Sequence, residues 1–319
     1  MGSRTSGALL GFALLTVGYL IVLIWADSRH QVFSQLPTLA FAMPMLVVAS
    51  SMTYLIRYLR WHWLLRRSGH ATPLLRGFAA YLSGFAFTAT PGKVGELVRI
   101  RYLAPLKVPP ARVVAAFIFE RAFDLIAVLM LSSLAIASTR TFIISAVFVT
   151  AFLSGLALAS AKLEWFAATA RSLDERGFRR TAMIVTAIKD GLSDCRIWMT
   201  PADIAVSLVF GLIAWSIASL AFLFLLERLD ITIAFTEALS IYPMSMLAGA
   251  ASMLPGGVGS TEATIVGLLS LHDVPLGLAT LAAVGIRLSS LWFAVVCGFV
   301  SVLGLELLKS PNRGSCDSR

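Results

Sequence analysis

Charged residues are scarce in this chain: Asp, Glu, Lys and Arg make up 13% of its 319 residues, whereas 58% are hydrophobic. A composition this apolar excludes an ordinary soluble domain and a disordered chain. Long polar stretches are also missing, so we expect one membrane domain over residues 1–319. The net charge of +9 does not indicate nucleic-acid binding. The basic residues lie mostly in short segments between apolar runs, where they orient a membrane protein.

Cysteine is equally sparse, and other familiar motifs are lacking. Cys195, Cys297 and Cys316 share no motif spacing. The sequence therefore predicts neither a disulfide framework nor a metal site, and we expect no cofactor. There is also no glycine-rich loop ending in GKS or GKT. Direct use of ATP through such a phosphate-binding loop is thereby excluded.

Apolar runs long enough to cross a bilayer core of roughly 30 Å recur along the chain. We expect an all-α polytopic protein with six spanning helices, at Gly7–Ala26, Pro37–Ile56, Val113–Ala137, Phe142–Ala161, Ala202–Leu226 and Gly277–Leu308. The first run is too long for the apolar region of a signal peptide, so we expect it to remain as a span.

A dense basic run follows the second expected span. It comprises Arg57, Arg60, Arg66, Arg67 and Arg76, with Trp61 and Trp63 interleaved. This pattern favours a cytoplasmic loop with an interfacial aromatic belt over a patch that binds anionic lipid or nucleic acid. Both termini of this multi-pass protein are then cytoplasmic. Residues 162–200 are again basic, and we expect either an amphipathic helix on the inner membrane surface or a solvated loop that contains a helix.

Two further apolar segments are each interrupted by the same kind of helix breaker. The first reads Pro91-Gly92-Lys93-Val94-Gly95-Glu96, and the second reads Pro255-Gly256-Gly257-Val258-Gly259 with Glu262 three residues on. Proline removes a backbone donor and glycine disfavours the helix. Inside hydrocarbon such a break requires protein or a water-filled cavity to satisfy the freed backbone groups. We therefore expect two re-entrant hairpins.

The two halves of the chain correspond beyond these breaks. Arg121 and Arg287 each lie 13 residues after a Val-Pro pair, at Val108 and Val274. We place the first hairpin on the inner side and the second on the outer side. That order is the inverted-repeat pattern of secondary transporters, whose hairpins meet near the midplane. Repeat one is expected at about 37–137 and repeat two at about 202–308.

Three motifs carry a family resemblance. They are Pro91-Gly92-Lys93-x-Gly95-Glu96-x-x-Arg99, Glu120-Arg121-x-x-Asp124 and Pro255-Gly256-Gly257-x-Gly259-x-x-Glu262. Together they resemble the lysylphosphatidylglycerol synthase transmembrane-domain family, also called flippase-like, over nearly the whole chain. The resemblance implies a protein of the cytoplasmic membrane that handles phospholipids or polyprenyl-linked lipids. Bifunctional relatives carry a soluble aminoacyl-transferase domain, which this sequence does not show, so lipid aminoacylation is not supported.

Charged side chains within the apolar segments are costly and indicate a site. Our candidate substrate-binding residues are Lys93, Glu96, Arg99, Glu120, Arg121, Asp124, Glu262 and Arg287. Arg121 has carboxylates in its own helix, and the Glu120-Arg121-Asp124 group is either structural or functional. Arg287 has none, so Glu262, Glu96 or a ligand phosphate must neutralise it. On this basis we expect Arg287→Gln to leave folding nearly intact and to weaken lipid transport.

These features favour a transporter over an enzyme: a translocase for an anionic phospholipid or polyprenyl-linked lipid. One alternative is an intramembrane head-group transferase or phosphatase, for which no activated nucleophile can be named. Another is a non-catalytic partner of envelope-lipid enzymes. The expected partner is membrane lipid. Further candidate partners are a coupling ion carried by Glu96 or Glu262, a second copy of the chain, and envelope-synthesis enzymes.

The topology generates a first prediction. Single cysteines at Arg76 and Lys107 should both react with an impermeant thiol reagent from the cytoplasmic side, because both flank the first hairpin. Cysteines at Arg228 and Asp273 should react from the outer side. Labelling of the first two positions from opposite faces would show that Gly77–Leu103 spans the membrane.

Overall fold

The protein is described here from a computed structural model, in which residues 36–133 and 163–308 are described. The described residues are helical, without strands. The longer helices are α2 (Leu36–Arg67), α3 (Leu74–Ser83), α5 (Pro110–Ser132), α7 (Leu163–Glu175), α8 (Arg179–Cys195), α9 (Pro201–Arg228), α10 (Phe235–Ala251), α11 (Ser260–Ser270), α12 (Leu276–Arg287) and α13 (Phe293–Leu307). The short ones are η2 (Gly84–Phe87), η3 (Pro91–Val98), α4 (Arg99–Leu103), η4 (Ala104–Leu106), η6 (Arg196–Trp198), η7 (Pro255–Gly257) and the π-helical η8 (Leu288–Trp292).

Three stretches of the described chain are long and apolar enough to cross a membrane: Pro37–Arg67, Pro201–Arg228 and Leu276–Leu307. They correspond to α2, α9 and the continuous run of α12, η8 and α13. Helix α5 has 23 residues and carries three charged residues in its middle. The expected spans Gly7–Ala26 and Phe142–Ala161 lie outside the described residues. The chain is a helical polytopic membrane protein, as the sequence predicts.

The second expected span does not end at Ile56, which corrects the interpretation of the basic run. Helix α2 continues to Arg67, and Gly69, two residues beyond its end, has a φ of 83°. The amide of His70 donates to the carbonyl of Leu65, a capping arrangement typical of a left-handed C-terminal glycine. Arg60 and Trp61 are fully buried within this helix instead of lying in a cytoplasmic loop. A helix can keep such residues because partners on other helices neutralise the charge.

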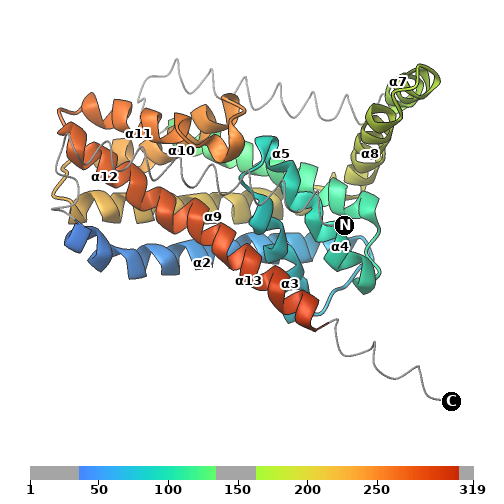
Figure 1. Cartoon of the computed structure of the whole chain (residues 1–319), viewed down its shortest axis with the longest axis horizontal. Coiled ribbons are helices and arrows are strands. Elements are labelled where there is room, and N and C mark those ends of the chain that lie inside the picture. The colour runs from blue at the N-terminus through green and yellow to red at the C-terminus, as the bar shows by residue number, and fades with distance from the viewer. Residues whose placement is uncertain (1–35, 134–162, 309–319) are drawn as a thin grey trace.

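Two helical hairpins enter the bundle from opposite ends (Figure 1). The first runs through α3 and η2 to the break at Pro91 and returns through η3 and α4. The second runs through α10 to the break at Pro255 and returns through α11. Their tips meet: a Cβ atom placed on Gly256 would lie 3.3 Å from the Cα atom of Ala89. The sequence-based expectation that the two breaks lie close together is therefore confirmed.

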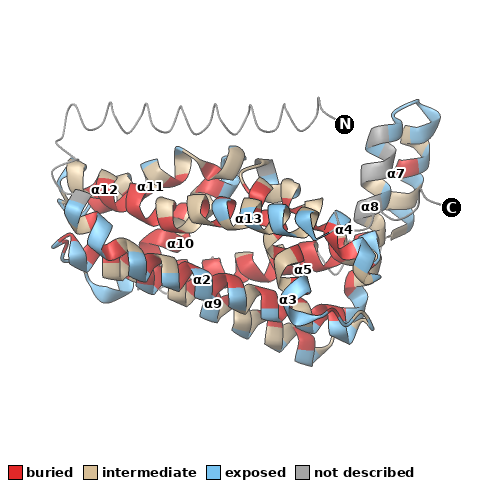
Figure 2. Cartoon of the chain, turned by 60° about the horizontal axis from the view of Figure 1, so that its bottom comes forward, coloured by how far each residue is buried: buried red, intermediate tan, exposed pale blue. Residues whose placement is uncertain are grey.

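The buried side chains form two apolar clusters, one around each hairpin. The first cluster is built mainly from α2, α9, α10 and α12. The second lies around α3, α4, α5 and the C-terminal half of α2. Burial is concentrated on the facing sides of these helices (Figure 2).

Residues 163–198 form a helical hairpin, made of α7, α8 and η6. Helix α8 packs on α5, where a Cβ atom on Gly191 would lie 2.9 Å from a methyl group of Val114. The Cys195 thiol, in the same contact, donates to the carbonyl of Ala115 over 3.4 Å. Burial raises the pKa of this thiol to about 12, so it is protonated and unreactive near neutral pH.

Helix α13 supports the first hairpin through one glycine, which gives a second prediction. A Cβ atom on Gly298 would collide with the backbone amide of Ala86, whereas one on Gly304 would meet nothing within 4 Å. Gly298→Ala should therefore lower the free energy of unfolding by about 1–3 kcal/mol. Gly304→Ala, on the same helix, should leave it unchanged or raise it, because alanine favours the helix. Thermal unfolding in detergent measures both, and equal midpoints would contradict the close packing.

Candidate functional site

The two breaks share one backbone geometry. Each begins with an extended residue, Thr90 with ψ 152° and Leu254 with ψ 148°. Two consecutive left-handed residues follow the proline in each: Gly92 and Lys93 with φ 61° and 56°, and the pair 256–257 with φ 63° and 64°. Glycine adopts this conformation freely, whereas a residue with a side chain is disfavoured by about 1 kcal/mol or more. Lys93 occupies the position that glycine holds in the second break.

Side chains of the hairpin itself satisfy the polar groups of the first break. Glu96 accepts hydrogen bonds from the Thr88 hydroxyl and from Arg99 Nη2, each over 2.8 Å. Thr90 Oγ1 accepts from the Gly95 amide over 2.7 Å. Arg99 is fully buried, with its guanidinium 4.4 Å from the ring centre of Tyr81. Glu96 and Arg99 therefore hold the shape of the break.

Arg287 performs the same task for the second break. Its Nε atom donates to Glu262 Oε1 over 2.8 Å, and its Nη2 atom donates to the carbonyl of Gly256 over 2.6 Å. Glu262 Oε2 also accepts from the Gly259 amide over 2.7 Å. Of the partners expected from the sequence, Glu262 is thus the one that neutralises Arg287. Arg287 is 1% exposed and fastens the second break to α12.

A buried ionic cluster lies between α2, α5 and the first hairpin. Its ion pairs join Arg60 Nη2 to Asp124 Oδ1 (2.7 Å) and Glu120 Oε1 (3.4 Å), Arg121 Nη2 to Glu120 Oε1 (3.2 Å) and Asp124 Oδ2 (3.5 Å), Arg57 Nη1 to Asp124 Oδ2 (3.5 Å), and Arg99 Nη1 to Glu120 Oε2 (3.5 Å). The Tyr81 hydroxyl also donates to Glu120 Oε1 over 2.7 Å. The cluster links three elements that are distant in the sequence.

Arg57 and Arg60 belong to this cluster, although sequence reasoning assigned them to a cytoplasmic loop. They are three residues apart and therefore share one face of α2. Two signals in the sequence could have identified them. Apolar and aromatic residues continue at helical spacing past Ile56, through Trp61 to Leu65, and the next helix-ending signal is the Ser68-Gly69 pair.

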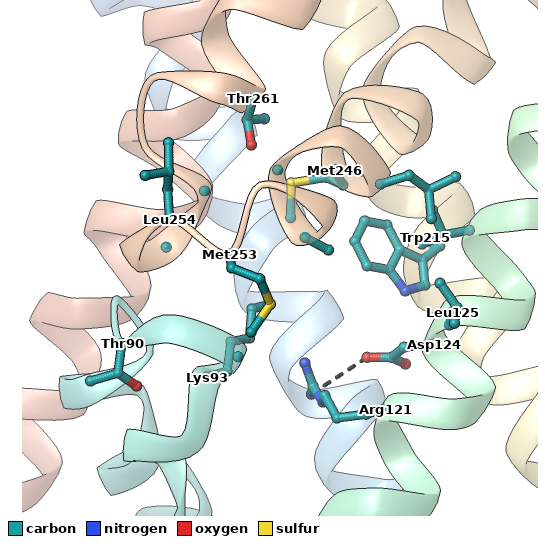
Figure 3. A pocket seen from close by; sticks show the side chains of 17 residues that line it. Thr90, Lys93, Arg121, Asp124, Leu125, Trp215, Met246, Met253, Leu254 and Thr261 are labelled. Carbon is teal, nitrogen blue, oxygen red and sulfur yellow. Dashed lines mark ion pairs between the residues drawn. The ribbon is translucent and has the colours of Figure 1, made fainter. Parts of the chain in front are cut away.

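A cavity of about 300 Å³ opens where the two hairpins meet α5 and α9. Its charged end is formed by Lys93, Arg121 and Asp124, and its apolar wall by Leu125, Val128, Trp215, Met246, Leu247, Met253 and Leu254. Lys93 and Leu254 lie on one side of the cavity, and Trp215 and Leu125 on the other (Figure 3). Gly92, Gly256 and Gly257 bring the backbone of both breaks to its edge.

Several hydrogen-bond donors on this cavity have no protein partner. Trp215 Nε1, Arg121 Nε and Thr261 Oγ1 are buried and make no hydrogen bond with the described residues. Among the same residues, the Lys93 ammonium makes no hydrogen bond or ion pair. Unsatisfied buried donors are rare in folded proteins because each forfeits its hydration. These donors can bind acceptor oxygens placed in the cavity.

A smaller cavity, of about 90 Å³, adjoins the first break on the side of α2 and α12. Its polar lining includes Ser50, Thr53, Arg57, Thr88, Glu96, Arg287 and Ser290. Lys93 lines both cavities. In the described part of the chain, no group of three or more His, Cys, Asp or Glu residues is arranged to hold a metal ion.

The candidate residues thus divide into three groups. Lys93, Arg121 and Asp124 line the larger cavity, while Glu96 and Arg287 line the smaller one. Arg99, Glu120 and Glu262 line neither and support the groups that do. Arg121 has a side chain 24% exposed, compared with 2% for Arg287. The arginine that can reach a ligand in the larger cavity is therefore Arg121, and Arg287 is engaged in holding the fold.

This arrangement gives a third prediction. Arg60→Met should strand Asp124 and Glu120 as buried charges and lower the free energy of unfolding by about 3–5 kcal/mol. Arg287→Gln should also destabilise the protein, in contrast to the expectation from the sequence, because Glu262 and the Gly256 carbonyl lose their partner. The exposed Arg66, replaced by methionine in the same helix, is the control and should change stability by less than about 0.5 kcal/mol. Thermal unfolding in detergent compares the three variants, and an Arg60→Met midpoint equal to that of the control would contradict the role of the cluster.

Comparison with known proteins agrees with the motifs in these two breaks. One relative is a UPF0104 membrane protein of Methanothermobacter thermautotrophicus. It is 26% identical over 117 residues, which are 37% of this chain and 35% of the relative, so the match spans about a third of that protein's length. The family model described as the lysylphosphatidylglycerol synthase TM region matches residues 8–298, which include both hairpins and the ionic cluster. The chain belongs to the lysylphosphatidylglycerol synthase transmembrane-region family.

Proposed function

We propose that this protein moves an anionic lipid across the cytoplasmic membrane, with the lipid phosphate held in the larger cavity. Membership of the family implies a lipid-related membrane function. The observation that carries the proposal is Lys93: an ammonium without a hydrogen-bond or ion-pair partner among the described residues, at the point where both hairpins and both cavities meet.

The backbone of Lys93 supports this role. Its φ of 56° is disfavoured for a residue with a Cβ atom, and the second break has glycine at this position. Unfavourable backbone conformations persist where the surrounding structure enforces them, and they concentrate at binding sites. The gain from placing a cation in the cavity offsets the cost of about 1 kcal/mol or more. Arg121 adds a planar guanidinium suited to phosphate oxygens.

The rest of the cavity suits a lipid. Its wall is formed by apolar side chains, which include the deformable Met246 and Met253. A head group at the charged end would leave its hydrocarbon chains along this wall and in the surrounding lipid. Hairpins that enter from opposite ends and meet at the site resemble the transporters in which access alternates around a fixed midplane site.

The distribution of charge supports a cytoplasmic position for the end of the bundle at which the first hairpin enters. Basic residues gather there: Arg66, Arg67, Arg76, Arg101, Lys107 and Arg112. The opposite end combines both signs: Glu227, Arg228, Asp230, Glu237 and Asp273. Short basic segments face the cytoplasm in most membrane proteins. The enzyme alternative finds less support, because Glu120 lines neither cavity and arginines engage Asp124 on both its oxygens.

The fourth prediction tests Lys93. Lys93→Gly removes the ammonium and keeps the left-handed backbone, so stability should change by less than about 1 kcal/mol. Transbilayer movement of a fluorescent anionic phospholipid in proteoliposomes should slow about tenfold or more, since a charge-assisted hydrogen bond is lost. Lys93→Arg should keep much of the rate.

Lys107→Gly is the matched control. Lys107 also has a left-handed φ, of 61°, but it is exposed and lines neither cavity. This variant loses the same charge and relieves the same backbone strain, and it should move lipid at the normal rate. An unchanged rate for Lys93→Gly, or an equal loss in both variants, would refute the proposed site.

A further inference from the structure

The ionic cluster at the site carries more positive than negative charge. Arg57, Arg60, Arg99 and Arg121 are connected by ion pairs to three carboxylates, those of Glu96, Glu120 and Asp124. Lys93 adds a fifth cation. The described residues at the site therefore carry an excess of two positive charges, because Arg287 and Glu262 neutralise each other.

An excess of this size within the membrane is costly unless a ligand balances it. Two of these five cations, Lys93 and Arg121, line the larger cavity, and Arg57 lines the smaller one. Arg60 and Arg99 are buried and bound to carboxylates, whereas Lys93 and Arg121 line the cavity wall. A ligand in the larger cavity would therefore meet Lys93, which has no ion pair among the described residues, and Arg121.

We infer that the lipid held in this cavity carries a phosphate monoester, a dianion near neutral pH, in preference to a phosphodiester. This inference rests on the proposed function and specifies its substrate class. A monoester has a charge of −1.5 to −2 at pH 7 and three strong acceptor oxygens. These match the two excess charges and the donors of Lys93, Arg121 and Trp215.

Other lipid head groups match the charge and the donors of the cavity less well. A phosphodiester has one negative charge and two free oxygens, so it would leave one cation uncompensated and one donor unsatisfied. A head group that bears an amine adds another cation to a site already in excess. Inorganic phosphate has the same anionic chemistry as the monoester. It lacks the chains that would cover the apolar wall formed by Leu125, Met246 and Leu254.

The experiment compares lipids with identical acyl chains. The full chain is placed in nanodiscs of neutral phosphatidylcholine, and binding of dioleoyl phosphatidic acid and of dioleoyl phosphatidylglycerol is followed by Trp fluorescence. At about pH 7.5 the monoester should bind about tenfold tighter or more, because it makes an additional charge-assisted contact. Lys93→Gly should remove most of this preference, whereas Lys107→Gly should keep it. Two controls complete the comparison. Inorganic phosphate lacks the acyl chains, and dioleoylglycerol lacks the phosphate.

The pH dependence supplies an independent readout. The second ionisation of a phosphate monoester has a pKa of about 6, so monoester affinity should rise between about pH 5.5 and pH 7.5. The diester keeps one charge throughout. The groups that face the site are Arg57 and Tyr54 on α2, Lys93 and Glu96 in the first break, Arg121 and Asp124 on α5, Tyr242 on α10 and Arg287 on α12. Both lipids meet these same groups, so the difference between the lipids reports the ligand's own ionisation.

The outcomes separate this inference from the proposed function. Equal or tighter binding of the diester, with both lipids dependent on Lys93, overturns the monoester preference and leaves an anionic-lipid translocase in place. Binding of neither lipid, or binding that Lys93→Gly does not weaken, overturns the proposed site itself. Inorganic phosphate that binds as tightly as phosphatidic acid would make the cavity a site for a free anion and would overturn both.

Discussion

The structure depends on the burial of charge between α2 and α5. Arg60 and Asp124 are separated by 64 positions in the sequence and pair at 2.7 Å inside an apolar bundle. Buried ion pairs add little net stability compared with apolar packing, but removal of one partner strongly destabilises the fold because it leaves a buried charge unpaired. The pair therefore fixes geometry: it sets the register of α2 against α5 and presents Arg121 beside the first hairpin.

The two breaks have the same backbone shape and different chemistry. In the second, glycines occupy both left-handed positions, and Arg287 closes the break by binding Glu262 and a backbone carbonyl. In the first, Glu96 and Arg99 close the break, and one of the left-handed positions carries Lys93. Backbone groups are satisfied in both, as a break inside hydrocarbon requires. Only the first break adds a free cation to the cavity, so the functional asymmetry of the site lies in a single position.

Much of this arrangement could be predicted from the sequence, because its causes are local. A proline followed directly by glycine, with a further glycine close by, disfavours the helix locally, so both hairpin tips could be located from the sequence. The length of the apolar runs identified α2, α9 and the α12–α13 span, and helical spacing placed Glu120, Arg121 and Asp124 together on α5. Correspondence between the halves also predicted that the tips meet, and the contact of Ala89 with Gly256 confirms it.

Only the tertiary structure decided which charges pair. The sequence alone placed Arg60 in a cytoplasmic loop, because of the basic run with interleaved tryptophans, and left Arg287 to be neutralised by Glu262, Glu96 or a ligand phosphate. Folding placed Arg60 against α5 and Arg287 against Glu262, 25 residues earlier, and left Arg121 open to the cavity. Local sequence determines where a helix breaks, because that depends on the residues of one segment. The partner of a buried charge depends on distances between segments, and those are set when the helices pack.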